Sequence, residues 1–306
     1  MKIGLIDVDG HNFPNLALMK LSAWHKANGD SVEWYEPLIG GHYDKVYMSK
    51  VFSFTDDYMY PINADEVIMG GTGYNIQNID GREQYTKDKD LPYEVEHIYP
   101  DYSLYGITDT AYGYMTRGCP RGCKFCIVGE KEGRKSVTVA KLTEFWRGQK
   151  NIVLLDPNPI AAKEWEYNFQ QLIGSKAYVD FSQGVDIRLM TEKKAKLMSH
   201  IKVKQVHFAW DRYKDKDIVV EKLKMFREAT GWDRHKISCF VLTNFDTTVE
   251  QDLERIYLLR DIGVSPYLMI YDKYNLPKRH ELRRMQRWCN NRFLFRSIER
   301  FEDYVS

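Results

Sequence analysis

The chain has 306 residues, of which 43% are hydrophobic and 28% charged, and its formal net charge is +1. This composition is ordinary for a globular protein of one large or two medium domains, and so small a net charge gives no general affinity for polyanions. No apolar run approaches the ~18 residues that a membrane span requires, and the acidic start MKIGLIDVDGHNF is unlike a signal peptide. We therefore expect a cytoplasmic protein that has no membrane partner.

The first hundred residues predict a small parallel α/β layer. Short apolar segments that are typical of strands occupy residues 2–8, 31–36, 43–54 and 64–71. Between the first two, apolar residues recur at helical spacing as far as Asn28-Gly29, a pair typical of a helix C-cap. Strands that alternate with helical or loop segments indicate a parallel sheet. Residues 87–106 are polar, with prolines and tyrosines, and we expect them to connect two domains.

A second and more regular series begins at Ala111. The candidate strands are 111–117, 151–156, 178–184, 205–211, 237–244 and 265–272, and the amphipathic segments between them are 139–149, 161–174, 191–201, 217–231 and 248–263. This alternation predicts right-handed parallel units, and six of them can form an open or closed barrel. Because functional residues of parallel sheets lie at the carboxyl ends of the strands, we expect the six polar strand ends to converge on one site.

The segment 278–300 is basic, with eight Lys or Arg residues and two Glu residues. We expect one or two helices there, with Leu282, Met285 and Cys289 on one face. A solvated basic face is the simplest interpretation, and contact with an acidic or phosphorylated substrate or with nucleic acid is the alternative. The sequence has no pattern of basic and aromatic residues typical of an RNA-binding sheet, so we expect no nucleic-acid partner.

Three of the five cysteines lie close together in the stretch TRGCPRGCKFC, which follows a predicted strand. Clustered cysteines in a reducing compartment indicate metal or redox chemistry rather than disulfides. A structural zinc site takes four ligands, usually as two pairs, and Cys239 and Cys289 do not form a second pair. Cys119, Cys123 and Cys126 would leave one iron of a 4Fe–4S cluster without a protein ligand, and an open metal position permits catalysis. Cysteines that bind no metal, or a zinc knuckle, are the alternatives.

The segment CPRGCKFC at residues 119–126 resembles the signature of the radical S-adenosylmethionine (radical SAM) enzymes, including the aromatic Phe125 before the last cysteine. The resemblance extends over residues 111–275, where the strand count matches the partial (β/α)6 barrel of that family. It implies a 4Fe–4S cluster on the three cysteines, with S-adenosylmethionine bound at the open iron and Phe125 near the adenine. Reductive cleavage then yields a 5′-deoxyadenosyl radical that abstracts hydrogen from a substrate, which the sequence does not identify. A flavodoxin or ferredoxin-type reductant is implied as the partner.

The resemblance also implies cofactor-binding residues at the strand ends. Asp156 and Asn158 stand where the family has a Gly-Gly-Glu-like segment that holds the methionine amino group. Gln183, Asp186 and Arg188 follow the third strand and are expected to hold the ribose hydroxyls and the methionine carboxylate. Arg188 suits the carboxylate because a guanidinium pairs with it through two hydrogen bonds. A helix cap or a structural salt bridge is the alternative role for each residue.

Two further residues of this kind end the fourth and fifth strands, Asp211 and Asn244. The segment VLTNFDTTVEQD resembles a glycine-bearing region of the family, but Leu242 and Asn244 stand in place of the glycines. The catalytic residue that returns a hydrogen atom to a substrate radical is not fixed by any spacing. The candidates by chemistry are Cys239, Tyr271 and Cys289.

Residues 1–80 resemble the cobalamin-binding type of Rossmann domain that precedes the barrel in one branch of the family. Asp9-Gly10-His11 begins the Asp-x-His-x-x-Gly motif of modules that bind cobalt through histidine, but Pro14 occupies the glycine position. We therefore do not expect cobalamin to bind. The predicted α/β fold comprises a Rossmann-like parallel sheet with its linker at 1–105, a radical SAM partial barrel at 106–277 and a basic helical tail at 278–306.

The sequence thus favours a cobalamin-independent radical SAM enzyme of unknown reaction type. A cobalamin-dependent radical SAM methyltransferase is the alternative within the same family. A non-catalytic iron–sulfur protein that binds or senses a ligand is the alternative from another class. The enzymes would have a pocket for S-adenosylmethionine, which this protein would lack.

Overall fold

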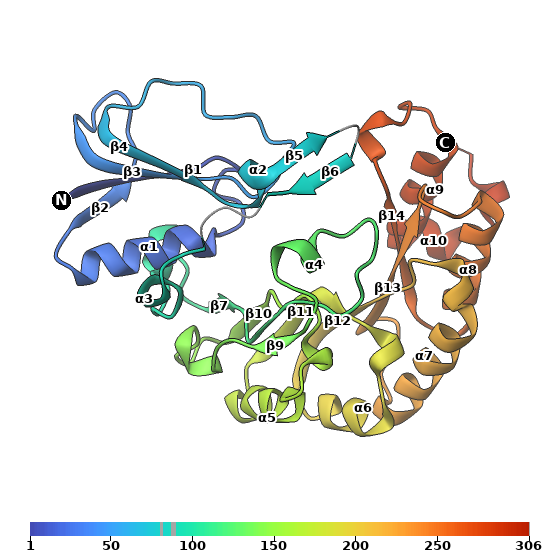
Figure 1. Ribbon diagram of the computed structural model, residues 1–306. Helices are drawn as coiled ribbons and strands as arrows, with labels where there is room; N and C mark the ends of the chain where they lie inside the picture. The colour runs from blue at the N-terminus through green and yellow to red at the C-terminus, as the bar shows by residue number, and fades with distance from the viewer. Residues whose placement is uncertain (80–81, 87–89, 306) are drawn as a thin grey trace. The chain divides into compact units, whose positions relative to one another are not determined.

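The computed structural model describes residues 1–79, 82–86 and 90–305 and shows a mixed α/β protein with parallel sheets (Figure 1). The chain divides into two compact units, which are described separately. The first comprises Met1–Lys135 and Val139–Ile152, and the second comprises Ser136–Thr138 and Val153–Ser306. The domain boundaries expected from the sequence stay a prediction. Among the described residues, no helix is long and apolar enough to cross a membrane.

The first unit contains a four-stranded sheet in the order β2-β1-β3-β4, in which all neighbours are parallel. Its strands are β1 (Lys2–Asp7), β2 (Ser31–Trp34), β3 (Tyr43–Ser49) and β4 (Ala64–Gly70). Helix α1 (Leu16–Ala27) joins β1 to β2. The Asn15 side chain caps its first turn by accepting a hydrogen bond from the Leu18 amide, and Asn28 is its C-cap, as predicted.

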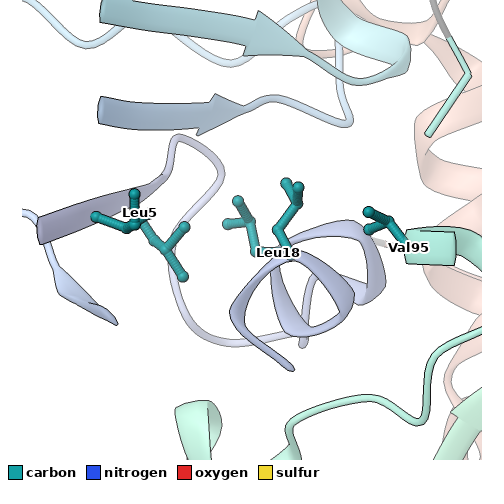
Figure 2. Close-up of a cluster of buried hydrophobic side chains, with 5 residues drawn as sticks. Leu5, Leu18 and Val95 are labelled. Carbon is teal, nitrogen blue, oxygen red and sulfur yellow. The ribbon is translucent and has the colours of Figure 1, made fainter. Parts of the chain in front are cut away.

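A cluster of buried side chains joins α1 to this sheet (Figure 2). Leu5 of β1 and Leu18 of α1 are each 1% exposed. Val95, in α3 (Tyr93–Glu96), is 3% exposed and packs into the same cluster. Part of the segment that the sequence assigns to an interdomain connection therefore belongs to the core of the first unit. Residues 87–89 of that segment lie outside the described residues.

The rest of the first unit consists of short elements. They are α2 (Thr72–Asn75), β5 (Ile76–Ile79), β6 (Arg82–Tyr85), η1 (Tyr102–Tyr105), β7 (Thr110–Gly113), β8 (Thr116–Arg117), α4 (Val128–Lys131) and the 3₁₀ turn η2 (Leu142–Glu144). Strand β7 neighbours the beginning of β10 (Asn151–Leu154). The strand predicted at 111–117 is thus two short strands.

The amphipathic helix predicted at 139–149 is wrong, because only η2 forms there. The side chain of Phe145 packs so closely on Gly113 that a Cβ built at Gly113 would lie 2.3 Å from its ring. The Phe145 carbonyl accepts a hydrogen bond from the Tyr102 hydroxyl at 2.7 Å, and Gly148 has a φ of +96°. A side-chain contact and a left-handed glycine therefore override the helical spacing of the apolar residues.

The second unit contains strands in the order β14-β13-β12-β11-β10, and β11 to β14 are parallel. The strands that follow β10 are β11 (Tyr178–Val185), β12 (Lys202–Ala209), β13 (Ile237–Thr243) and β14 (Ser265–Ile270). They alternate with helices α5 (Trp165–Ser175), α6 (Glu192–Ser199), α7 (Lys216–Thr230) and α8 (Val249–Asp261). All four predicted helices of this region are confirmed, and Figure 1 shows them along one side of the strands. The unit also contains β9 (Val137–Thr138) and the 3₁₀ turns η3 (Pro159–Ala161), η4 (Ile187–Leu189) and η5 (Tyr213–Asp215).

Alternate residues of these strands face the helices. The ring of Phe181 in β11 lies 6.0 Å from that of Phe169 in α5, and Phe208 in β12 lies 4.9 Å from Phe226 in α7. Since neighbouring side chains of a strand point to opposite faces, Asp180 and His207 lie on the other face of the sheet. That face carries polar side chains, whereas the face that packs on the helices is apolar.

The C-terminal tail forms helices, as the sequence predicts. The turn η6 (Lys273–Asn275) precedes α9 (Glu281–Asn290), which is followed by α10 (Arg292–Ser297) and the turn η7 (Phe301–Asp303). Leu282, Met285 and Cys289 are buried on α9 together with Trp288. The α9 helix packs on β14, so the tail is part of the second unit.

Candidate functional site

The cysteine-bearing loop lies between β8 and α4, in the first unit. Gly118 begins it with a φ of +85°, and a Cβ at this position would lie 2.1 Å from the Lys135 carbonyl oxygen. Gly122 has a φ of +56°, and a Cβ there would lie 2.4 Å from a guanidinium nitrogen of Arg134. Gly118 therefore requires glycine because a side chain would meet backbone, and the left-handed φ of Gly122 favours glycine there. The two glycines of the motif shape the loop that carries the thiols.

The three cysteines of this loop differ in exposure. Cys119 and Cys123 are half-buried and Cys126 is exposed. The Cys119 amide donates to the Gly133 carbonyl at 3.0 Å, and the Cys126 amide donates to the Cys123 carbonyl at 3.1 Å. Three accessible thiols on a tight turn are a donor set that suits an iron–sulfur cluster. Nevertheless, no three His, Cys, Asp or Glu side chains in the described part of the chain are gathered to hold a metal ion, so the ligand assignment stays a prediction.

An ionic network holds the residue that precedes the loop. One guanidinium nitrogen of Arg117 lies 2.9 Å from Glu96, the other lies 3.8 Å from Glu132, and the guanidinium stacks 4.1 Å from the Tyr114 ring centre. Lys20 of α1 also contacts Glu96, at 3.0 Å. Burial lowers the pKa of Arg117, but Glu96 and its neighbours outweigh burial and raise it. Arg117 therefore anchors the start of the loop to the first unit.

The predicted cofactor-binding residues after β10 and β11 lie in the second unit. Asp156 and Asn158 are each 2% exposed, and the Ser136 hydroxyl donates to the Asn158 carbonyl at 3.0 Å. Gln183 is exposed at the end of β11. Phe125, the predicted adenine neighbour, is half-buried in the cysteine loop of the first unit. These positions stay candidate cofactor contacts.

Arg188 is held by two carboxylates of the second unit. Its Nε donates to Asp186 Oδ1 at 2.8 Å, and its Nη1 donates to Asp215 Oδ2 at 2.6 Å. Burial lowers the pKa of Arg188, but the two carboxylates outweigh it and raise the pKa. Sequence reasoning did not single out Asp215, which lies directly before α7. A ligand carboxylate at Arg188 has to share this guanidinium with both aspartates.

Asp211 lies beside the same group, immediately after Trp210. Burial raises the pKa of Asp211 to about 6, against the opposing effects of Arg188 and Arg255. A carboxyl group with a perturbed pKa at a strand end is typical of a functional site. The role of Asp211 as a cofactor contact stays a prediction.

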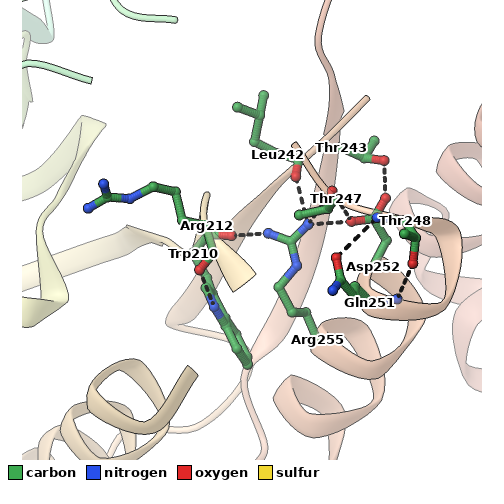
Figure 3. Close-up of polar contacts among 9 residues, drawn as sticks. All are labelled: Trp210, Arg212, Leu242, Thr243, Thr247, Thr248, Gln251, Asp252 and Arg255. Atoms are coloured by element: carbon green, nitrogen blue, oxygen red, sulfur yellow. Dashed lines mark hydrogen bonds and ion pairs between the residues drawn. The ribbon is translucent and has the colours of Figure 1, made fainter. Parts of the chain in front are cut away.

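Arg255 of α8 was missed by the sequence analysis, although it joins two of the predicted strand ends (Figure 3). Its side chain is completely buried. It donates to the carbonyl of Trp210 at 2.5 Å and to that of Leu242 at 2.7 Å. It also forms an ion pair with buried Asp252, which accepts hydrogen bonds from Thr243 and Thr247. The network fixes the backbone just before Asp211 and Asn244.

Asn244 and the three candidate hydrogen donors lie at different depths. Asn244 has a left-handed φ of +65°, and its side-chain amide donates to the Tyr271 carbonyl at 2.8 Å. The Tyr271 side chain is 42% exposed. Cys239 and Cys289 are buried, and burial raises the pKa of both thiols, that of Cys289 to about 12. Tyr271 is thus the accessible member of the three.

His11, the first half of the cobalamin-like motif, is packed against aromatic rings in the first unit. It stacks on Trp34 at 4.1 Å between ring centres, and the edge of Tyr105 lies 5.8 Å away. The Tyr105 hydroxyl in turn donates to Asp7 at 2.6 Å. The imidazole is exposed, but its orientation is set by this stack.

Comparison with known proteins finds similarity to solved structures but not to curated sequences. No protein-family model matches the chain, and no curated protein matches its sequence. The structure is similar to that of the radical SAM methyltransferase TsrM from Kitasatospora setae, which was solved with cobalamin and a [4Fe–4S] cluster bound. The TM-score is 0.61 at 11% identity, over 88% of this chain and 74% of that chain. The two chains share a fold.

A second structural similarity is weaker. It is to the cobalamin-dependent S-adenosylmethionine radical enzyme OxsB, with a TM-score of 0.39 and 14% identity. It covers 88% of this chain and 49% of that chain.

Proposed function

We propose that the chain is a radical SAM enzyme whose cluster ligands are Cys119, Cys123 and Cys126. The observation that carries the proposal is the C-x3-C-x2-C spacing in the loop between β8 and α4, in a chain whose fold is similar to that of TsrM. A 4Fe–4S cluster at this loop would supply one electron to S-adenosylmethionine and so generate a 5′-deoxyadenosyl radical. The substrate from which hydrogen is taken is not identified.

The residues of the chain have separate roles in this proposal. The loop presents three thiolates, and Gly118 and Gly122 give it the required turn. The second unit supplies polar strand ends that hold S-adenosylmethionine, in the arrangement of a partial barrel. The proposed contacts are Phe125 of the loop together with Asp156, Asn158, Gln183, Asp186, Arg188, Asp211 and Asn244. A flavodoxin or ferredoxin-type protein supplies the electron, and the basic tail favours an acidic or phosphorylated substrate.

A cobalamin-dependent radical SAM methyltransferase is the second candidate. The similarity to TsrM favours it, because that methyltransferase was solved with cobalamin and covers 88% of this chain. In this proposal the parallel sheet of the first unit is a Rossmann-like cobalamin domain. The motif Asp9-Gly10-His11 has Pro14 in place of its glycine, which argues against a histidine ligand to cobalt. Cobalamin would then bind through other contacts.

The first experiment is anaerobic reconstitution of the full chain with iron and sulfide. Iron content and the visible absorption of the cluster are measured, dithionite and S-adenosylmethionine are added, and 5′-deoxyadenosine is quantified by chromatography. We expect the wild-type protein to form both the cluster and 5′-deoxyadenosine. Cys123→Ala is expected to lose both. Glu130→Ala, which changes an exposed side chain of the adjoining α4, is the matched control and is expected to keep both.

The outcomes separate the candidate functions. A cluster without cleavage or binding of S-adenosylmethionine would contradict the radical mechanism and favour a non-catalytic iron–sulfur protein. A cluster that survives Cys123→Ala would contradict the ligand assignment. Saturable binding of hydroxocobalamin to the reconstituted protein, followed by absorption, would favour the methyltransferase.

A further inference from the structure

Three polar side chains lie side by side on the face of the second unit's sheet that is turned away from α5–α8. They are Asp180 of β11, His207 of β12 and Ser238 of β13, and we refer to them as the polar cluster. His207 and Ser238 are direct partners in the parallel register, and His207 Nδ1 lies 2.5 Å from Ser238 Oγ. In the register of β11 and β12, Asp180 pairs with Gln205, two residues before His207, so the side chains of Asp180 and His207 lie on the same face of neighbouring strands. The charge of Asp180 also acts on the pKa of His207. None of the three is among the predicted cofactor-binding residues.

The hydrogen bond to Ser238 determines which nitrogen of His207 carries the proton. Ser238 is 4% exposed, and His207 is its hydrogen-bond partner within the described residues. A buried hydroxyl has to donate its one hydrogen, so Ser238 donates to Nδ1. Burial lowers the pKa of His207, although Asp180 opposes this, and the imidazole is therefore neutral near pH 7. Nε2 then carries the hydrogen and is a donor.

Asp180 supplies the complementary acceptor on the neighbouring strand. Its Oδ1 is buried and accepts no hydrogen bond from the described residues. A buried carboxylate oxygen without a donor is costly, so such a group calls for a ligand or a proton. Burial raises the pKa of Asp180, opposed by His207 and by Lys204.

Aromatic packing holds the donor in place. The His207 imidazole stacks on Phe240 of β13 with 4.9 Å between ring centres and a 6° interplanar angle. The edge of Tyr267 in β14 supports Phe240 at 5.7 Å. Gly184, at a φ of +91°, passes close to both, since a Cβ there would lie 3.3 Å from the His207 carbonyl and 3.8 Å from the Phe240 ring. A preorganised donor binds with a smaller loss of entropy.

We propose that the polar cluster binds an alcohol or carboxamide group of the substrate. Its oxygen accepts a hydrogen bond from His207 Nε2, and its O–H or N–H donates to the Asp180 carboxylate. A carboxylate lacks the donor and an alkylammonium lacks the acceptor, so neither satisfies both residues. The proposal rests on the proposed function only in calling the ligand a substrate.

The first test is the tautomer of His207, measured by nitrogen NMR on the full chain labelled with ¹⁵N-histidine. His207→Gln assigns the signal, and His235→Gln, which removes an exposed histidine of the same unit, is the matched control. We expect the Nε2–H tautomer in the wild type and a mixture of tautomers in Ser238→Ala. An Nδ1–H tautomer in the wild type would overturn the proposal, because Nε2 would have no hydrogen to donate.

The second test is titration of the same protein with acetamide, with sodium acetate and methylammonium chloride as comparison probes. We expect acetamide to shift the His207 signal saturably in the wild type and in His235→Gln, and acetate and methylammonium to bind at least about tenfold more weakly. Asp180→Leu is expected to weaken acetamide binding about tenfold. Circular dichroism checks that each variant is folded, and Asp180→Ala, which also lacks an acceptor, is used where the leucine variant is not.

No saturable shift by acetamide, or equal affinity in the folded Asp180 variant, would overturn the proposal. Neither test uses the cluster or S-adenosylmethionine. Failure of this proposal is therefore distinguishable from failure of the proposed function.

Discussion

Arg255 shows how one buried charge positions two strand ends. The guanidinium donates hydrogen bonds to the carbonyls of Trp210 and Leu242, and it forms an ion pair with Asp252. Both side chains are fully buried. In such a pair the removal of one partner is far more harmful than the absence of both, because the remaining charge is left uncompensated in an apolar environment.

Arg255→Met is expected to lower the free energy of unfolding by about 3–5 kcal/mol. Urea denaturation followed by tryptophan fluorescence measures this loss. Arg279→Met, at an exposed arginine, is the control and should change stability by no more than about 0.5 kcal/mol. Adding Asp252→Asn to Arg255→Met should recover part of the loss. A loss of less than about 1 kcal/mol for Arg255→Met would show that the network is not a major stabilising contact.

Asp211 leads to a pH-dependent prediction at the same scale. Its pKa of about 6 in the folded protein lies above the ordinary value of 3.8. Between pH 3.8 and about pH 6, the folded state therefore retains a proton that the unfolded chain has released. The contribution of Asp211 to stability is therefore complete below about pH 4 and is lost as the pH rises through about 6. Asp211 is thus destabilising near neutral pH.

Asp211→Asn removes this titration. We expect the variant to be more stable than the wild type at pH 7 by about 2 kcal/mol, and the difference to vanish near pH 4. Urea denaturation at several pH values measures it, with Asp246→Asn, at an exposed carboxylate, as the control. The same difference at both pH values would mean that the pKa of Asp211 is not raised.

The connection from β13 to α8 illustrates what decides an element boundary. Asn244 takes a left-handed conformation at the end of β13. The radical SAM family, which this segment resembles, has a glycine at this position. Thr248 and Gln251 then form a capping box at the start of α8. The Thr-x-x-Gln spacing is readable from the sequence, because a capping box depends only on neighbouring residues. The positive φ cannot be predicted from the sequence, because asparagine adopts both right-handed and left-handed backbone conformations.

Comparison of Asn244→Gly with Asn244→Ala isolates the cost of this conformation. Both variants lose the hydrogen bond to Tyr271, but only glycine tolerates the positive φ without strain. We expect the alanine variant to be less stable than the glycine variant by about 1 kcal/mol, as measured by thermal unfolding. Equal stability of the two variants would show that the turn relaxes to another conformation.

At the scale of the whole molecule, the proposed cluster would link cofactor loading to folding. A cluster bound to the native cysteine loop and not to the unfolded chain stabilises the native state by mass action. The effect is expected in the first unit, where the loop and its Arg117 network lie. It should be absent when the loop cannot hold the cluster.

We therefore expect reconstituted wild-type protein to unfold at a higher temperature than the same protein after removal of iron with a chelator under anaerobic conditions. Cys123→Ala should show no such difference. Differential scanning calorimetry measures both proteins, and their iron contents are determined beforehand. An equal melting temperature with and without the cluster would indicate that the loop is not part of the cooperative fold.

The sequence alone determined the features that depend on neighbouring residues. Hydrophobic period predicted β11 to β14 and the helices between them, and glycine and cysteine spacing located the loop at 118–126. The helix predicted at 139–149 failed because a contact between Phe145 and Gly113 overrode the local period. Period and turn chemistry are local properties, and local signals hold unless packing opposes them.

Only the tertiary structure decided which polar residues meet. Asp180, His207 and Ser238 lie in three predicted strands, but their register and common face bring them together. In the same way, the sequence gives no sign that Arg255 of an amphipathic helix is buried, and only the contacts with the strand-end carbonyls show it. The register of strands that are distant in sequence is set by the packing of their apolar faces, and a shift of one residue would reverse every side chain. That long-range information is absent from any short stretch of sequence.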